Sequence, residues 1–221
     1  MATRFYFAST GSPIVSPAFD AGWEQTAQAV RRQLQRKSTL STTTALTNST
    51  AITVPITTTQ DMLCAQFVSD PLPPTRMMVG TFSTVQRALE SATTANVTLA
   101  VVVKAHPADG GASLGTLYST FNIDTEFGTT AATRIVNAQA TTALTINTTW
   151  RLVVEIGGHA AAPTAAGSYT LRFGTAAASD FALTSGLTTD LNTWCETSQD
   201  LATEDLNNFM FASANGLSVS I

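Results

Sequence analysis

Residues 150–157 read Trp150-Arg151-Leu152-Val153-Val154-Glu155-Ile156-Gly157. Every second residue from Trp150 to Ile156 is a large apolar one, so their side chains share one face of an extended strand. The following Gly157-Gly158 pair is a typical strand end. The same alternation recurs at residues 97–103 and 169–173. These stretches predict β-strands with one buried face.

Further short apolar segments follow at similar spacing, separated by Gly, Pro and polar turn residues. They lie at residues 52–56, 63–68, 82–89, 117–123, 133–138, 144–146 and from Trp194. Pro55 indicates an edge strand, because proline cannot donate to a sheet. A parallel sheet would require strands that alternate with helices, and the sequence shows no such pattern. The predicted fold class is therefore all-β, an antiparallel β-sandwich of jelly-roll-like type.

The composition restricts the functional classes. Charged residues make up 12% of the 221 residues, about half the usual share, and the formal net charge is −4. This balance excludes a strongly basic nucleic-acid binder and a polybasic membrane-surface protein. Threonine replaces the missing charge at about one residue in six, and it favours pleated surfaces. The first ten residues contain no apolar run typical of a secretory signal, and no apolar run is long enough to span a bilayer.

The chain divides into three parts. Residues 1–22 are predicted to form an irregular N-terminal arm, because Gly11, Pro13 and Pro17 interrupt any regular element. Residues 23–196 form the β-sandwich domain, and residues 197–221 form a C-terminal extension. Within the domain, residues 23–37 carry apolar residues at helical spacing, with Asp20 as a helix N-cap. Alternation over residues 30–34 favours a strand instead, and both interpretations remain open.

Apolar and basic residues near the two ends are candidate assembly contacts. Aromatic side chains anchor interfaces, basic residues suit an acidic partner surface, and an alternating terminus can add a strand to a neighbouring sheet. The candidates are Phe5, Tyr6, Phe7, Arg31, Arg32, Arg36, Phe209, Phe211, Leu217, Val219 and Ile221.

Chemistry-bearing motifs are sparse. The only two histidines are His106, which has Asp109 nearby, and His159, and neither has the sequence context of a catalytic triad. Asp124, Glu126 and Glu155 are candidates for the paired carboxylates of a glycoside hydrolase. Asn122, Asp124 and Glu126 are spaced by two, so they share one face of an extended segment and could form one side of a calcium site. A solvated strand face is the favoured interpretation of these three residues. Two buried thiols are expected at Cys64 and Cys195, with a disulfide as the alternative. We expect no enzyme activity, cofactor or metal.

Five stretches resemble a poorly characterised family of tailed-bacteriophage virion proteins. They are Ser16-Pro17-Ala18-Phe19-Asp20 with Gly22-Trp23-Glu24, Phe67-Val68-Ser69-Asp70-Pro71-Leu72, Arg151-Leu152-Val153-Val154-Glu155-Ile156-Gly157, Arg172-Phe173-Gly174, and Asp190-Leu191-Asn192 with Trp194. The similarity covers residues 1 to about 196. It implies a β-sandwich that is part of the virion, and it does not specify head, neck or tail.

The first functional hypothesis is a capsid decoration (cement) protein that binds and stabilises the phage head. Its expected partners are the major capsid protein or other virion proteins and sister subunits, arranged as a homotrimer. Neither nucleic acid nor a membrane is expected as a partner. The alternative is a jelly-roll module that binds host surface glycans by stacking sugars on exposed tryptophans. Trp23, Trp150 and Trp194 are the candidates, although Trp150 lies on the apolar face of a predicted strand and is expected in the core. A glycan hydrolase is the third hypothesis.

Overall fold

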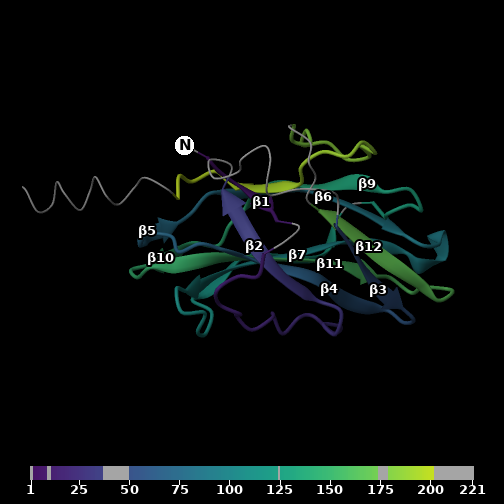
Figure 1. Ribbon diagram of the computed structural model, residues 1–221, viewed down its shortest axis with the longest axis horizontal. Helices are drawn as coiled ribbons and strands as arrows, with labels where there is room; N and C mark the ends of the chain where they lie inside the picture. Colours follow the sequence, from purple (N-terminus) through teal and green to yellow (C-terminus); the bar gives the residue numbers. More distant parts are fainter. Residues whose placement is uncertain (1, 9–10, 37–49, 124, 174–178, 202–221) are drawn as a thin grey trace, which may run out of the picture.

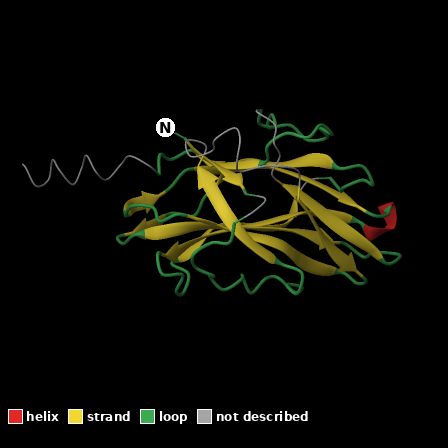
Figure 2. Ribbon diagram, viewed as in Figure 1, coloured by secondary structure: helices red, strands yellow, loops and turns green. Residues whose placement is uncertain are grey.

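The computed structural model describes residues 2–8, 11–36, 50–123, 125–173 and 179–201. Almost all regular structure in them is β-strand, and the short 3-10 helix η2 (Thr93–Ala95) is the exception (Figure 2). The strands are β1 (Thr3–Phe7), β2 (Val30–Arg36), β3 (Thr50–Ile56), β4 (Gln60–Ser69), β5 (Thr75–Met78), β6 (Thr81–Glu90), β7 (Val97–Pro107), β8 (Gly115–Ile123), β9 (Ala132–Ala140), β10 (Leu144–Ile146), β11 (Trp150–Ala160), β12 (Gly167–Phe173) and β13 (Trp194–Thr197). The prediction of an all-β, sandwich-like fold is confirmed.

One 11-stranded sheet follows the path β3-β12-β6-β13-β1-β2-β4-β11-β7-β8, and β9 pairs with the other edge of β6. The sheet folds back on itself into two layers (Figure 1). We call the layer of β4, β11, β7 and β8 the β11 layer, and the layer of β9, β6, β12, β3, β13 and β1 the β6 layer. β2 links them, because its first half runs parallel to β4 and its end pairs antiparallel with β1.

The pairing is antiparallel throughout the sheet apart from β2 with β4. The sheet is thus mixed, where the sequence predicted a purely antiparallel one. β5 and β10 form a separate two-stranded sheet. β3 lies at one end of the strand path, so the edge position predicted from Pro55 is confirmed.

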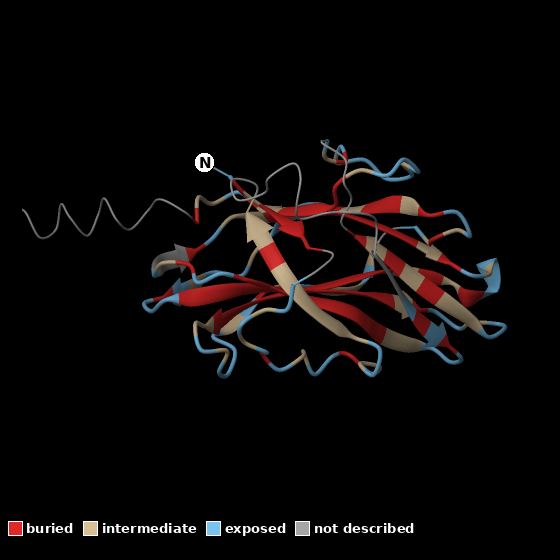
Figure 3. Ribbon diagram, in the orientation of Figure 1, coloured by how far each residue is buried: buried red, intermediate tan, exposed pale blue. Residues whose placement is uncertain are grey.

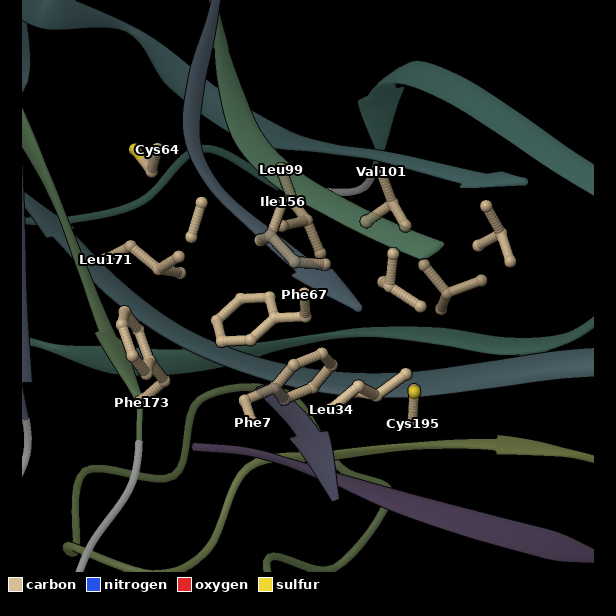
Figure 4. Packing of buried hydrophobic residues seen from close by; sticks show 14 of the residues in the cluster. Phe7, Leu34, Cys64, Phe67, Leu99, Val101, Ile156, Leu171, Phe173 and Cys195 are labelled. Carbon is tan, nitrogen blue, oxygen red and sulfur yellow. The ribbon is translucent and has the colours of Figure 1, made fainter. Parts of the chain in front are cut away.

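Aromatic rings join the layers in the main core. Phe67 of β4 lies between Phe7 of β1 and Phe173 of β12, with ring centroids 4.6 and 5.0 Å away (Figure 4). Farther along, Phe82 of β6 stacks on Tyr118 of β8 at 5.8 Å. Fully buried large rings and aliphatic side chains of this kind supply most of the folding free energy.

The outer faces of both layers are also largely covered (Figure 3). Residues 11–29 cross the outer face of the β11 layer, where Trp23 packs with Leu63 and Val102. Residues 179–193 cross the outer face of the β6 layer, where Phe181 packs with Tyr6, Val85 and Trp194. The β11 layer is therefore buried on both faces at β4, β7 and β11, which explains why these strands are apolar at almost every position.

The structure corrects two predictions near the N-terminus. The arm proposed for residues 1–22 contains β1, which pairs with β13 and β2 inside the main sheet. The helix proposed for residues 23–37 is absent from the described residues 23–36, and the alternative strand over residues 30–36 is the correct one. A short helix is only marginally stable alone, whereas β2 obtains backbone partners on both sides.

The proposed boundary at residue 197 falls inside an element. β13 ends at Thr197, and Leu201 is still buried, with its backbone N–H donating to the Thr3 hydroxyl at 2.8 Å. The C-terminal part of the extension, residues 202–221, lies outside the described residues.

Candidate functional site

Glu155 is the centre of a buried polar network on the outer face of the β11 layer. The side chains of Trp150, Leu152, Val154 and Ile156 enter the main core, so Glu155 points the other way. Its carboxylate is fully buried. Oε2 accepts a hydrogen bond from Trp23 Nε1 at 2.6 Å, and Oε1 accepts one from Gln66 Nε2 at 2.9 Å. The backbone N–H of Asp20 donates to both oxygens, at 3.2 and 3.1 Å.

Asp20 links this network to a cation. Its Oδ2 lies 3.2 Å from Lys104 Nζ, whose side chain is almost fully buried, and its Oδ1 accepts the Gly22 N–H at 2.9 Å. Asp20 therefore connects residues 17–23 to β7 and does not cap a helix, as the sequence had suggested.

Arg31 closes the other side of the network. It donates from Nε to Gln66 Oε1 at 3.0 Å and from Nη2 to the Pro17 carbonyl at 3.2 Å. Its guanidinium also lies 4.0 Å above the Phe19 ring, a favourable cation–π geometry. Arg31 thus makes intramolecular contacts, in place of the partner contact expected from the sequence. Arg32 and Arg36 are half-buried on the same strand.

Gly157 permits the close approach of Trp23 to β11. A Cβ at Gly157 would lie 1.9 Å from the Met62 carbonyl oxygen and 2.7 Å from Trp23 Cζ3. The register between β4 and β11 shifts here, so the glycine marks a bulge. The predicted strand end at Gly157-Gly158 is wrong, because β11 continues to Ala160.

Arg151 fixes the opposite end of β11. It donates from Nε to the Ala108 carbonyl and from Nη1 to the Ser69 carbonyl, both at 2.8 Å. The two loops that leave β4 and β7 are thereby held together. The contacts of Glu155, Asp20, Arg31 and Arg151 join neighbouring strands or hold loops and the covering segment on the sheet. The network is therefore suited to structural support.

A second network lies on the outer face of the β6 layer. Asp180 Oδ2 accepts from Tyr6 Oη at 2.7 Å and from Arg4 Nη1 at 3.1 Å, and Arg4 also pairs with Glu196 at 2.9 Å. The Arg4 guanidinium lies 3.9 Å above the Trp194 ring. Burial raises the pKa of Tyr6, and Asp180 adds to this effect. These contacts attach residues 180–196 to β1.

Glu90 is a buried carboxyl at the end of β6. It accepts the Val97 N–H at 3.1 Å, and its Oε1 has no donor among the described residues. Burial raises the pKa of Glu90 to about 7; the Val97 hydrogen bond opposes this, and the hydrogen-bonded Glu126 carboxyl reinforces it. A neutral Glu90 keeps its proton and can donate a hydrogen bond to the Glu126 carboxylate.

The two histidines do not form catalytic pairs with a nucleophile in the described part of the chain. His106 is buried and contacts the Gly111 carbonyl at 3.0 Å, whereas Asp109 accepts the Gly111 N–H. Burial lowers the pKa of His106, and Lys104 adds to this effect. His159 lies 2.7 Å from Asp61. His106 therefore has no hydrogen bond to Asp109, its neighbour in the sequence.

The candidate calcium ligands do not converge in the described residues. Asn122 accepts a hydrogen bond from the Thr98 hydroxyl at 3.0 Å, Glu126 pairs with Glu90, and Asp124 lies outside the described residues. No group of three or more potential metal ligands was found in the part of the chain that the structure describes. Cys64 and Cys195 are both free and buried, as expected, and burial raises the pKa of each thiol.

The other interface candidates are largely internal. Phe5, Tyr6 and Phe7 are at most 1% exposed, so the prediction that they contact a neighbour is wrong. Trp23, Trp150 and Trp194 are also buried, which removes them as platforms for sugar stacking. The large apolar side chains that are exposed among the described residues are Ile14, Val79 and Leu114.

The remaining candidates, Phe209, Phe211, Leu217, Val219 and Ile221, lie outside the described residues. No helix in the described ranges has the length and hydropathy needed to cross a membrane.

Sequence reasoning missed the Glu155 network, although a signal was present. Gln66, Lys104 and Glu155 are polar residues in the middle of strands that are apolar on both faces. Such residues need buried partners, which predicts a covering segment. Each of the five stretches named in the sequence analysis contributes a residue to the two networks or to the main core; these residues are Trp23, Ser69, Glu155, Phe173 and Trp194. No protein-family model matches the chain, and no curated protein matches it significantly.

Proposed function

We propose that the protein is a structural component of a tailed-bacteriophage virion, a capsid decoration protein that binds the outside of the head and stabilises the shell. It acts without catalysis or a cofactor. It binds the major capsid protein and two sister subunits, as a homotrimer at a local three-fold axis.

The observation that carries this proposal is the internal use of charge. In the described part of the chain, seven of the 11 basic residues contact acidic groups, carbonyls or side-chain amides of the same chain; they are Arg4, Arg31, Arg32, Arg87, Lys104, Arg134 and Arg151. The exposed strand positions and turns are rich in threonine, serine and asparagine. A surface with little free charge loses little hydration energy when it packs against other subunits.

The family resemblance supports the same proposal. Asp20, Trp23 and Glu155 belong to stretches that resemble virion proteins, and they hold the covering segment on the β11 layer. These residues therefore support a rigid scaffold. A rigid scaffold suits a protein that reinforces a shell, because little conformational entropy is lost on binding.

The test is cryo-electron microscopy of the phage particle that encodes the chain. The expected result is density for this fold on the outer surface of the head, in three-fold clusters. Particles that lack the chain, or that carry it only at the tail, would contradict the decoration role. Purified protein should also bind to particles from which it has been removed.

Binding of the isolated protein to host glycans, without binding to heads, would favour the attachment module instead. The Ile14→Ala variant is a control for the particle-binding measurement, because it changes an exposed side chain and leaves both buried networks intact. If this variant stays folded and binds particles less well, the loss is due to the exposed contact and not to unfolding.

A further inference from the structure

Two arginines lie directly opposite each other on neighbouring strands of the β6 layer. β6 and β12 are neighbouring strands (Figure 1). They pair antiparallel, and Arg87 is the register partner of Arg172. Ala88, Leu171 and Phe173 point into the main core, so both arginines point to the outer face. Side chains in such cross-strand pairs are close enough to interact, and like charges there are destabilising.

Only Arg87 has an acidic partner among the described residues. It forms an ion pair with Asp190 and donates from Nη2 to the Thr188 carbonyl at 2.9 Å. Burial lowers the pKa of Arg87, Asp190 opposes this, and the charge of Arg172 lowers it further. The second guanidinium therefore adds a positive charge that Asp190 alone does not balance.

Both arginines also have unused donors. The Nε atoms of Arg87 and Arg172 are buried and have no hydrogen-bond partner in the described part of the chain. A buried donor without an acceptor costs free energy, and a buried positive charge without a counterion costs more. An external acceptor that binds these two arginines would remove both costs, so its binding there is favoured.

The site has access to solvent on one side. Arg172 is only partly buried, and Asp190 is 55% exposed at its side chain. Beside Arg172 on the same face, Thr170 bonds to the exposed Thr53 through their hydroxyls at 3.0 Å. The outer face of β12 and β3 beside Arg172 is therefore partly exposed to solvent.

We propose that Arg87 and Arg172 form an anion-binding site that accepts a carboxylate group from outside the described fold. A carboxylate has the planar shape and two acceptor oxygens that match a guanidinium fork. Asp190 supplies one carboxylate oxygen to Arg87 and none to Arg172 among the described residues. The bound carboxylate supplies the missing counter-charge between the strands. An acidic side chain of a partner protein is the occupant that this chemistry selects, whatever the biological role of the chain.

The test uses nuclear magnetic resonance of the full chain labelled with nitrogen-15. The Nε–Hε signals of arginine report directly on the two unused donors, and the Arg87→Lys and Arg172→Lys variants assign them by loss of a signal. Sodium acetate is titrated against sodium chloride at constant ionic strength. The expected result is a saturable shift of the Arg87 and Arg172 signals, with no shift for Arg4, which already has Glu196 and Asp180 as partners.

The Arg172→Gln variant provides the second measurement. Acetate should raise the Tm of the wild type, because it binds the folded state. The variant should lose both this rise in Tm and the saturable response at Arg87. In chloride alone, the Tm of the variant should exceed that of the wild type, because the repulsion between the two arginines is removed. Equal responses to acetate and chloride would overturn the proposal. A saturable response to phosphate but not to acetate would overturn the assignment of a carboxylate. An Arg172→Gln variant with a lowered Tm and an unchanged acetate response would show that Arg172 has only a packing role.

Discussion

At the level of single residues, Glu155 shows how a carboxylate is held inside an apolar layer. It has no cation in direct contact among the described residues, and its oxygens accept from Trp23, Gln66 and the backbone of Asp20. Hydrogen bonds to an ionised acceptor are about twice as strong as neutral ones. The stability of the covering segment therefore depends on whether these donors are present.

The Trp23→Phe substitution tests this dependence. It keeps an aromatic ring in the cluster and removes one donor, so the free energy of unfolding should fall by about 1–3 kcal/mol. Urea denaturation measures the change. Trp194→Phe is the matched control, because Trp194 Nε1 donates to the neutral Phe181 carbonyl. A loss for Trp23→Phe no larger than the loss for Trp194→Phe would show that Glu155 does not need this donor.

Glu90 predicts a pH-dependent stability. Its pKa of about 7 in the folded protein exceeds its ordinary value of 4.5, so the folded state holds a proton that the unfolded state releases. Stability from this group is then complete below about pH 4.5 and is lost as the pH rises to about 7. The loss should be about 1–3 kcal/mol, because one pKa unit corresponds to about 1.4 kcal/mol.

The Glu90→Gln variant should remove this pH dependence and be more stable than the wild type at neutral pH. The measurement is the free energy of unfolding from urea titrations across the acidic to neutral range. Glu196→Gln is the control, since Glu196 is partly exposed and pairs with Arg4. If Glu90→Gln keeps the slope of the wild type in this range, another group titrates there.

At the level of elements, β1 joins parts of the sheet that are far apart in sequence. It lies between β13 and β2, and the backbone of Phe7 is paired with Leu34. Without β1, the β6 layer loses its connection through β2 to the β11 layer. An N-terminal segment can thus be essential for the fold even though it precedes a long irregular stretch.

We predict that Phe7→Ala lowers the free energy of unfolding by about 3–5 kcal/mol, as expected for a fully buried ring, and that deletion of residues 1–8 prevents folding. Circular dichroism during urea denaturation tests both. Ile14→Ala is the control, because Ile14 is 81% exposed and its loss should change stability by less than about 0.5 kcal/mol. A truncated chain with a wild-type spectrum and transition would mean that β1 is dispensable.

At the level of the whole molecule, the two covered layers form a closed scaffold with little free charge. We predict that the chain is trimeric on the particle and forms trimers in solution at high concentration, because closed symmetry buries equivalent surfaces on each copy. Sedimentation equilibrium and native mass spectrometry measure the state in solution. A monomer under both conditions and on the particle would contradict the prediction.

The sequence by itself determined the secondary structure class and most strand positions. The alternation of Trp150, Leu152, Val154 and Ile156 is a local property, and any fold that buries one face of this strand must bury these residues. Buried reduced thiols at Cys64 and Cys195 followed in the same way from their apolar neighbours.

Only the tertiary structure decided how the strands pair and what covers them. The sequence around Phe5–Phe7 does not indicate that this segment pairs with β13, which lies almost 190 residues away. From the sequence alone, the same aromatic residues could pack on a neighbouring subunit or on their own sheet. Residues 30–36 carried both helical and strand patterns, and the backbone partners β1 and β4 favoured the strand. The partners of Glu155, Arg87 and Arg172 were equally hidden, because hydrogen bonds and charge pairs across a sheet depend on register, which is fixed only when the whole core packs.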